Sequence, residues 1–93
     1  MGRRREYVWT DAGLADARQH KVEPVEVEQA LFAPPGLRFE RHIGDLLLVV
    51  MGMADTARVI AVLCDRLTDT TYRIVSARAL AGAELDEWRR RLG

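Results

Sequence analysis

The stretch LLLVVMGM, residues 46–53, decides the fold of this chain. It is a continuous apolar run, and it directly follows Gly44-Asp45, a pair typical of a tight hairpin turn. A strand that is apolar along its whole length is usually covered on both faces. We therefore predict that residues 46–53 form the central strand of a sheet.

Short polar turns separate this strand from further apolar or alternating segments. Residues 37–42 alternate in polarity before it, and turns at residues 55–56 and 68–70 follow it. Three short connections in a row indicate antiparallel neighbours. The sequence therefore predicts a four-stranded antiparallel meander, with strands at residues 37–42, 46–53, 58–67 and 72–77.

The segments before and after this region have a helical period. Thr10 or Asp11 is suited to cap a helix, Pro24 suits the first turn of a second one, and APPG, residues 33–36, ends it. We predict helices at residues 11–21, 24–32 and 82–92. The fold class is then α+β, with two N-terminal helices, the four-stranded antiparallel meander sheet and a C-terminal helix. We expect the helices to cover one face of the sheet and to leave the other open.

Composition narrows the classes of function. The 93 residues are 48% hydrophobic and 30% charged, which predicts one globular domain over residues 1–93, with residues 1–6 as a flexible tail. The formal net charge is zero. Because proteins that bind phosphates over a broad surface usually carry a basic excess, any nucleic-acid site must be local.

The sequence also predicts the cellular compartment of the protein and the absence of a disulfide, a cofactor and a metal. Cys64 is the only cysteine, so we expect a buried thiol and no intrachain disulfide. The N-terminal arginines are not followed by a signal core, and the longest apolar run is too short to span a bilayer, which predicts a cytoplasmic protein without membrane contact. No phosphate-binding loop occurs, and neither His20 nor His42 has a partner at metal-ligand spacing, so no cofactor and no metal are expected.

Arginines on the predicted strands are the main chemical feature. Arg58, Arg73 and Arg78 belong to adjacent strands, and a meander would bring them into one neighbourhood. Regular alternation would place Arg73 and Arg78 on opposite faces, unless the strand is interrupted near Ala77. The alternative is that each arginine pairs with an acidic neighbour and holds the sheet to the last helix. Those neighbours are Asp65, Asp69 and Glu84.

His20 lies at the predicted end of the first helix. A histidine there favours a role as a C-terminal cap, because a cation suits that end of the helix dipole. Imidazole also changes protonation near neutral pH, so His20 remains a possible general acid or base. His42 has the setting of an ordinary surface residue.

Three segments, taken in order, resemble the BrnT-type toxins of bacterial toxin-antitoxin systems. They are HKVEPVEVEQALF (residues 20–32), GMADTARVIAVL (52–63), and YRIVSARAL (72–80) followed by AELDEW (83–88). The family has a His-Gly-Val segment, a Gly-Arg-Thr strand pair and a Ser/Thr-Ala-Arg strand before a final helix. The match runs from about Tyr7 to Leu92.

This resemblance implies a RelE-like fold and an endoribonuclease that cleaves RNA without metal or cofactor. Such a toxin inhibits growth or translation and is neutralised by a ribbon-helix-helix antitoxin. Arginines would hold the scissile phosphate, while a histidine or glutamate would move the 2′-hydroxyl proton. Carried over by position, the catalytic residues are Arg58, Arg73, Arg78, His20 and Glu84. The RNA-binding residues are Ser76 and Trp88.

The chain also departs from the family pattern. Met53-Ala54 stands where Arg-Thr is usual, Lys21 replaces a glycine, and Leu85 replaces an arginine. Loss of positive charge motivates a second hypothesis, a non-catalytic module of the toxin fold that binds an antitoxin-like partner protein. A third is a homodimer formed through a sheet edge.

Overall fold

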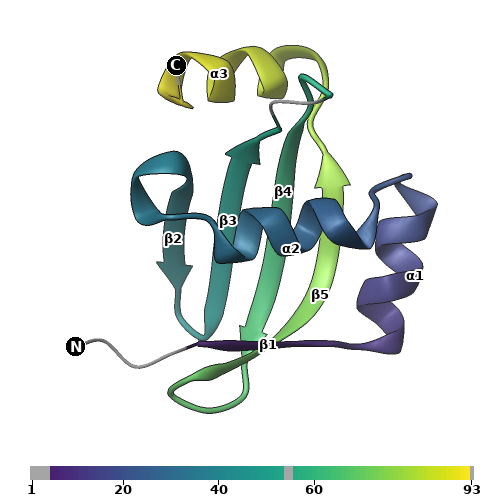
Figure 1. Cartoon of the computed structure of the whole chain (residues 1–93), viewed down its shortest axis with the longest axis vertical. Coiled ribbons are helices and arrows are strands. Elements are labelled where there is room, and N and C mark those ends of the chain that lie inside the picture. Colours follow the sequence, from purple (N-terminus) through teal and green to yellow (C-terminus); the bar gives the residue numbers. More distant parts are fainter. Residues whose placement is uncertain (1–4, 54–55, 93) are drawn as a thin grey trace.

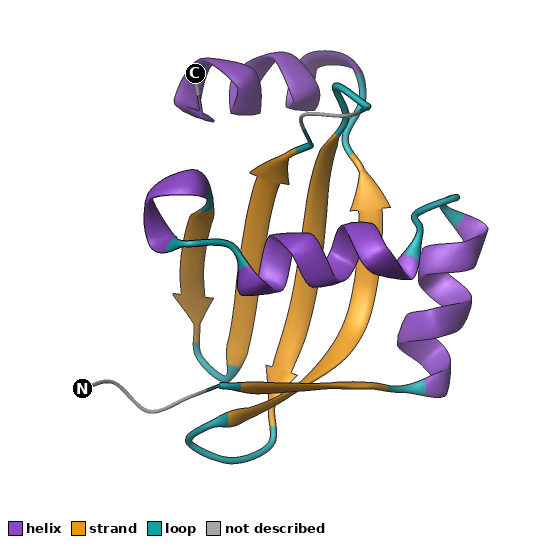
Figure 2. Ribbon diagram, viewed as in Figure 1, coloured by secondary structure: helices purple, strands orange, loops and turns teal. Residues whose placement is uncertain are grey.

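The computed structural model describes residues 5–53 and 56–92. Their helices and strands form an α+β structure, which confirms the predicted class (Figures 1 and 2). The strands are β1 (Glu6–Trp9), β2 (Phe39–Ile43), β3 (Leu46–Gly52), β4 (Val59–Arg66) and β5 (Thr71–Ala79). The helices are α1 (Asp11–Gln19), α2 (Pro24–Phe32) and α3 (Gly82–Leu92), and a short 3₁₀ helix, η1 (Pro35–Leu37), follows α2.

Strands β2 to β5 form the predicted antiparallel meander, with β3 between β2 and β4. The helices at residues 24–32 and 82–92 have the predicted bounds. The first strand of the meander starts later than residue 37, because Pro35–Leu37 form η1 instead. Within the described part of the chain, no helix is long and apolar enough to cross a membrane.

The meander does not make up the whole sheet, contrary to the prediction, because a fifth strand precedes it. β1 pairs in parallel with β5, giving the order β1-β5-β4-β3-β2. Tyr7 and Trp9 pack against the core, while the backbone of β1 satisfies hydrogen-bonding groups at the edge of β5. The predicted tail is wrong at residues 5 and 6, since Glu6 begins β1 and Arg5 pairs with Glu40. Residues 1–4 lie outside the described residues.

The main core lies between the sheet and helices α1 and α2. Its fully buried side chains include Val27 from α2, Leu47 from β3, Val62 from β4 and Ile74 from β5. Each buried side chain of this size contributes roughly 1.5–3 kcal/mol of hydrophobic free energy. Cys64 is buried in the same cluster, as expected, and this burial raises the pKa of its thiol to about 12.

The opposite face of the sheet is not fully open, contrary to expectation. Helix α3 lies across one end of the sheet (top of Figure 1) and packs Leu85 and Trp88 against a second cluster. That cluster contains Val50, Val59, Ala61 and Leu80. The apolar stripe of the predicted last helix therefore covers one end of this face.

A close approach positions α1 beside β5. The hydroxyl of Thr10 accepts a 2.8 Å hydrogen bond from the Gly13 N–H and donates one of 2.8 Å to the carbonyl of Ile74. A Cβ at Gly13 would lie 2.0 Å from that carbonyl oxygen, so only glycine permits this contact. The helix ends at Gln19 rather than at the predicted Lys21, because Lys21 adopts a left-handed φ of 56°.

Candidate functional site

A bulge in β5 decides where two of the predicted arginines point. The register with β4 shifts between Ile74 and Ser76, which leaves Val75 as an extra residue. An extra residue reverses the alternation of side chains beyond it. Arg73 and Arg78 therefore emerge on the same face. From the sequence, this outcome was expected only if the strand was interrupted near Ala77.

These two arginines do not meet, however. Arg73 lies opposite Asp65 of β4, and Arg78 lies opposite Ala61. These two positions of β4 are four residues apart, which corresponds to about 13 Å along the strand. Arg73 forms a 2.5 Å ion pair with Asp65, and Arg78 forms a 3.1 Å ion pair with Glu84. Both arginines therefore pair with an acidic neighbour, as the alternative predicted, but only Arg78 joins the sheet to the last helix.

Arg58 lies on the other face of the sheet. Its Nη1 is 3.1 Å from Oε1 of Glu26 in α2, and its Nη2 donates a 3.0 Å hydrogen bond to the carbonyl of Lys21. The prediction that Arg58, Arg73 and Arg78 share one neighbourhood is therefore wrong. Alternation along β4 directs Arg58 toward α2, and Glu26 is 32 positions away in the sequence, so no local pattern revealed the pair.

The structure links His20 and Ser76 through Asp16, a residue that the sequence did not single out. Oδ2 of Asp16 accepts hydrogen bonds from the Ser76 hydroxyl (2.9 Å) and the Ala77 N–H (3.0 Å). Nδ1 of His20 lies 3.4 Å from the same oxygen and 2.8 Å from the Asp16 carbonyl. The serine proton faces a carboxylate rather than the imidazole, and this arrangement holds α1 to β5.

The electrostatics of Asp16 agree with a structural role. Burial by itself raises the pKa of this carboxyl, but hydrogen bonds from Ala77 and Ser76 and the nearby His20 lower the pKa, and the net shift is downward. Asp16 is therefore held in its ionised form, which is the form that accepts these hydrogen bonds.

The remaining predicted site residues are also engaged in the fold. Glu84 is the ion-pair partner of Arg78. The ring of Trp88 packs against Phe39 with centroids 4.6 Å apart, and the guanidinium of Arg91 lies 5.4 Å from its centre. Trp88 thus attaches α3 to the sheet.

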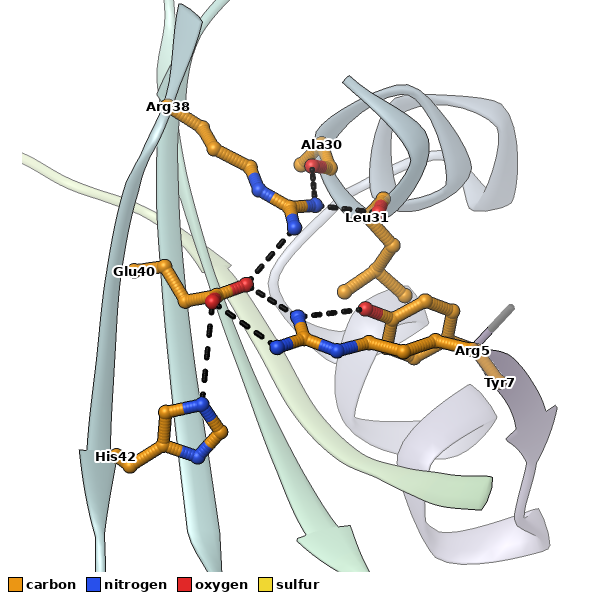
Figure 3. A network of polar contacts seen from close by, with 7 residues as sticks. All are labelled: Arg5, Tyr7, Ala30, Leu31, Arg38, Glu40 and His42. Carbon is orange, nitrogen blue, oxygen red and sulfur yellow. Dashed lines mark hydrogen bonds and ion pairs between the residues drawn. The ribbon is translucent and has the colours of Figure 1, made fainter. Parts of the chain in front are cut away.

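A polar network connects the start of the chain, the end of α2 and β2 (Figure 3). Glu40 accepts hydrogen bonds from Arg5 (2.5 and 3.1 Å) and from Arg38 (2.8 Å). Arg38 also donates to the carbonyls of Ala30 and Leu31 in the last turn of α2. The hydrogen bond from Arg5 lowers the pKa of Glu40 despite its partial burial. This network fixes the end of α2 against the sheet.

A groove opens beside α2, on the side where this helix passes into η1. It encloses about 640 Å³, and its apolar wall comes from α2, η1 and β3. Three of the apolar side chains are mostly exposed: Val25 (57%), Phe32 (66%) and Leu37 (61%). Met51 and Met53 line it from the sheet side. We call this site the α2 groove.

Charged residues border the α2 groove at the start of the helix. They are Glu23, Glu26 and Arg58. The Glu26 side chain is only 8% exposed, and its Oε1 accepts hydrogen bonds from Arg58 and from the Glu23 N–H. Its Oε2 is buried without a hydrogen-bond partner among the described residues. Met53, where the toxin family has an arginine, contributes to the apolar wall, while Ala54 lies outside the described residues.

Comparison of the chain with family models, with curated proteins and with solved structures found no match. Function is therefore inferred from the contacts of this chain. Among residues 5–53 and 56–92, no group of three or more histidine, cysteine or acidic side chains is placed to hold a metal ion. The sequence did not reveal the α2 groove, for which the apolar surface of Val25 and Phe32 on a short helix is a local signal.

Proposed function

We propose that this chain is a protein-binding module of the BrnT-type toxin fold and that it binds its partner through the α2 groove. The observation that carries the proposal is the concentration of exposed apolar side chains around one concave site: Val25, Phe32 and Leu37. Contiguous apolar surface of this kind marks sites of protein association, because water contact there is unfavourable.

Kinship with the RelE-like fold is part of this proposal. It is supported by the order of two helices, four antiparallel strands and a final helix, with β1 as an addition. The proposed partner is an antitoxin-like protein of the ribbon-helix-helix type, and the proposed compartment is the bacterial cytoplasm.

The state of the arginines favours binding over catalysis. Arg58, Arg73 and Arg78 are each paired with a carboxylate, and Arg58 is on the opposite face from the other two. A phosphate-binding pocket needs donors that converge on one point and are free to bind. The α2 groove, in contrast, offers an accessible surface.

The test is co-expression with the product of the adjacent reading frame, followed by size-exclusion chromatography with light scattering. We expect a stable heteromeric complex, no growth arrest when the chain is expressed alone, and loss of the complex in Phe32→Ser. Leu67→Ser is the matched control, since Leu67 is 55% exposed and lies outside the groove. A chain that forms no complex, or that forms only a stable dimer with itself, would contradict the proposal.

RNA cleavage is the second candidate function. It is favoured by the β5 bulge, which places Arg73 and Arg78 on one face with side chains 43% and 49% exposed. Exposed ion pairs are weak, so a phosphate could displace Asp65 or Glu84. Purified protein that cleaves RNA, with loss of cleavage in both Arg73→Ala and Arg78→Ala, would establish this activity. Intact RNA, or equal cleavage by the variants, would remove it.

A further inference from the structure

The α2 groove combines an apolar wall with an acidic end. Two carboxylates, Glu23 and Glu26, border it together with one guanidinium, that of Arg58. The two Nη groups of Arg58 already donate to Glu26 and to the Lys21 carbonyl. Among the side chains that line this end of the groove, two carboxylates and one guanidinium leave a net negative charge.

Glu26 gives the acidic end a second property. Its side chain is more than nine-tenths buried in the wall of the groove, and Oε2 has no hydrogen-bond partner among the described residues. This oxygen has almost no contact with solvent, so an incoming N–H group would reach it only if the groove wall opens, and it would then satisfy the unpaired acceptor. Glu23 is exposed beside it and is accessible to the same incoming group.

The volume of the groove also indicates the size of the ligand that it can bind. About 640 Å³ lies within the range of pockets that bury most of a compact ligand, and it is large enough for several apolar side chains. Met51 and Met53 are part of its wall, and methionine side chains adapt readily to irregular apolar partners.

We infer that the α2 groove binds a basic amphipathic helix of a partner protein. Bulky apolar side chains of that helix fill the space between Phe32, Leu37 and Met51, and a lysine or arginine at one end reaches Glu23 and Glu26. Apolar burial stabilises the complex, while the acidic end favours a basic helix over an acidic one and sets the direction in which the helix binds. This inference rests on the proposed function, because it names the part of the partner that is bound.

A pair of synthetic peptides tests the inference with the intact chain. The first is a short amphipathic peptide with leucines at positions i, i+3, i+4 and i+7 and lysines elsewhere. The second keeps the leucines and replaces each lysine by glutamate. Methyl-¹³C methionine labelling lets NMR follow Met51 and Met53 inside the groove during titration.

We expect the lysine peptide to shift the Met51 and Met53 methyl signals saturably and to bind at least tenfold more tightly than the glutamate peptide. Phe32→Ser should weaken the lysine peptide about tenfold, by loss of apolar contact. Glu23→Lys should remove most of the preference for the lysine peptide. Glu87→Lys is the charge-matched control, because Glu87 is 56% exposed on α3, and it should leave both affinities unchanged.

Other outcomes would overturn the inference. Equal affinity for the two peptides would show that the acidic end has no role, and unchanged methionine signals would show that the groove is not the site. The partner complex could form in co-expression while the two peptides bind equally or leave the methionine signals unchanged. In that case this inference is wrong and the proposed function stands. If no partner complex forms, the proposed function is wrong whatever the peptides do.

Discussion

The hydroxyl of Ser76 donates a 2.9 Å hydrogen bond to Oδ2 of Asp16, a residue 60 positions earlier in the chain. The Ala77 N–H donates to the same oxygen, just beyond the last residue of β5 that pairs with β1. Helix α1 thus takes over from β1 in satisfying the edge of β5. The Ser-Ala-Arg segment, part of the resemblance to the toxin family, serves here to hold a helix to the sheet.

Asp16→Ala should lower the free energy of unfolding by about 1–3 kcal/mol, because the Ser76 hydroxyl and the Ala77 N–H would lose their acceptor. Urea unfolding followed by circular dichroism measures the change. Asp86→Ala, at an exposed aspartate of α3, is the control and should be nearly neutral. Equal effects of the two substitutions would show that Asp16 does not hold α1 to β5.

Acid should destabilise the protein through Glu40 and Asp16, whose pKa values are lowered in the folded state. Their unfolded pKa values are roughly 4.3 and 3.9. Above those values both groups are ionised in both states, and their stabilisation is fully present. As the pH falls below about 4, the unfolded chain binds protons first, so the stabilisation is progressively lost until the pH passes the folded pKa values.

Glu40→Gln isolates one of these two contributions. The variant should lose on the order of 2 kcal/mol at pH 7, because Arg5 and Arg38 lose a charged acceptor. Its stability should also fall less steeply than that of the wild type between pH 5 and 3. Urea unfolding at a series of pH values supplies both measurements. The same steepness in both proteins would mean that Glu40 is not linked to proton binding.

Gly13→Ala should destabilise the protein, although alanine is the better helix former by about 1 kcal/mol. The added Cβ would lie 2.0 Å from the Ile74 carbonyl oxygen and would push α1 away from β5. Gly36→Ala is the matched control, because a Cβ there meets no atom within 4 Å. Thermal unfolding should show a lower midpoint only for Gly13→Ala, and a raised midpoint for that variant would contradict the close approach.

Lys21→Gly should stabilise the protein. Lys21 has a φ of 56°, where a side chain costs roughly 1–2 kcal/mol, of which the flexibility of glycine cancels about half. The midpoint of thermal unfolding should rise by roughly 3–6 °C for a domain of this size. Gln19→Gly, at an exposed position inside α1, is the control and should lower it. A lower midpoint for Lys21→Gly would show that the left-handed conformation is not strained.

The elements of the fold were largely predictable because their signals are local. The apolar run at residues 46–53, the prolines around α2 and the stripe of Leu85 and Trp88 each reflect how neighbouring backbone groups bond and which side is buried. β1 was missed because a four-residue strand has too short a pattern of its own. Its existence depends on a parallel pairing of Glu6–Trp9 with residues at the far end of the chain.

The candidate site was less predictable, for a related reason. Arg73 and Arg78 share a face only because Val75 is an extra residue in β5, and a bulge has no distinctive sequence here. Arg58 faces α2, where it pairs with Glu26. Glu26 lies in the first turn of that helix, and its sequence pattern predicted only a helix there. The groove beside α2 likewise has walls from three separate elements.

The sequence by itself determined which segments form α1 to α3 and β2 to β5, the α+β class, the burial of Cys64 and the position of His20 at a helix end. Only the tertiary structure decided which carboxylate each arginine meets, that Asp16 joins α1 to β5, and that the side chains of Phe32 and Leu37 border a groove. The division is physical. Periodicity follows from backbone bonding over a few residues, whereas pairing of side chains and the shape of a surface depend on how distant segments are brought together.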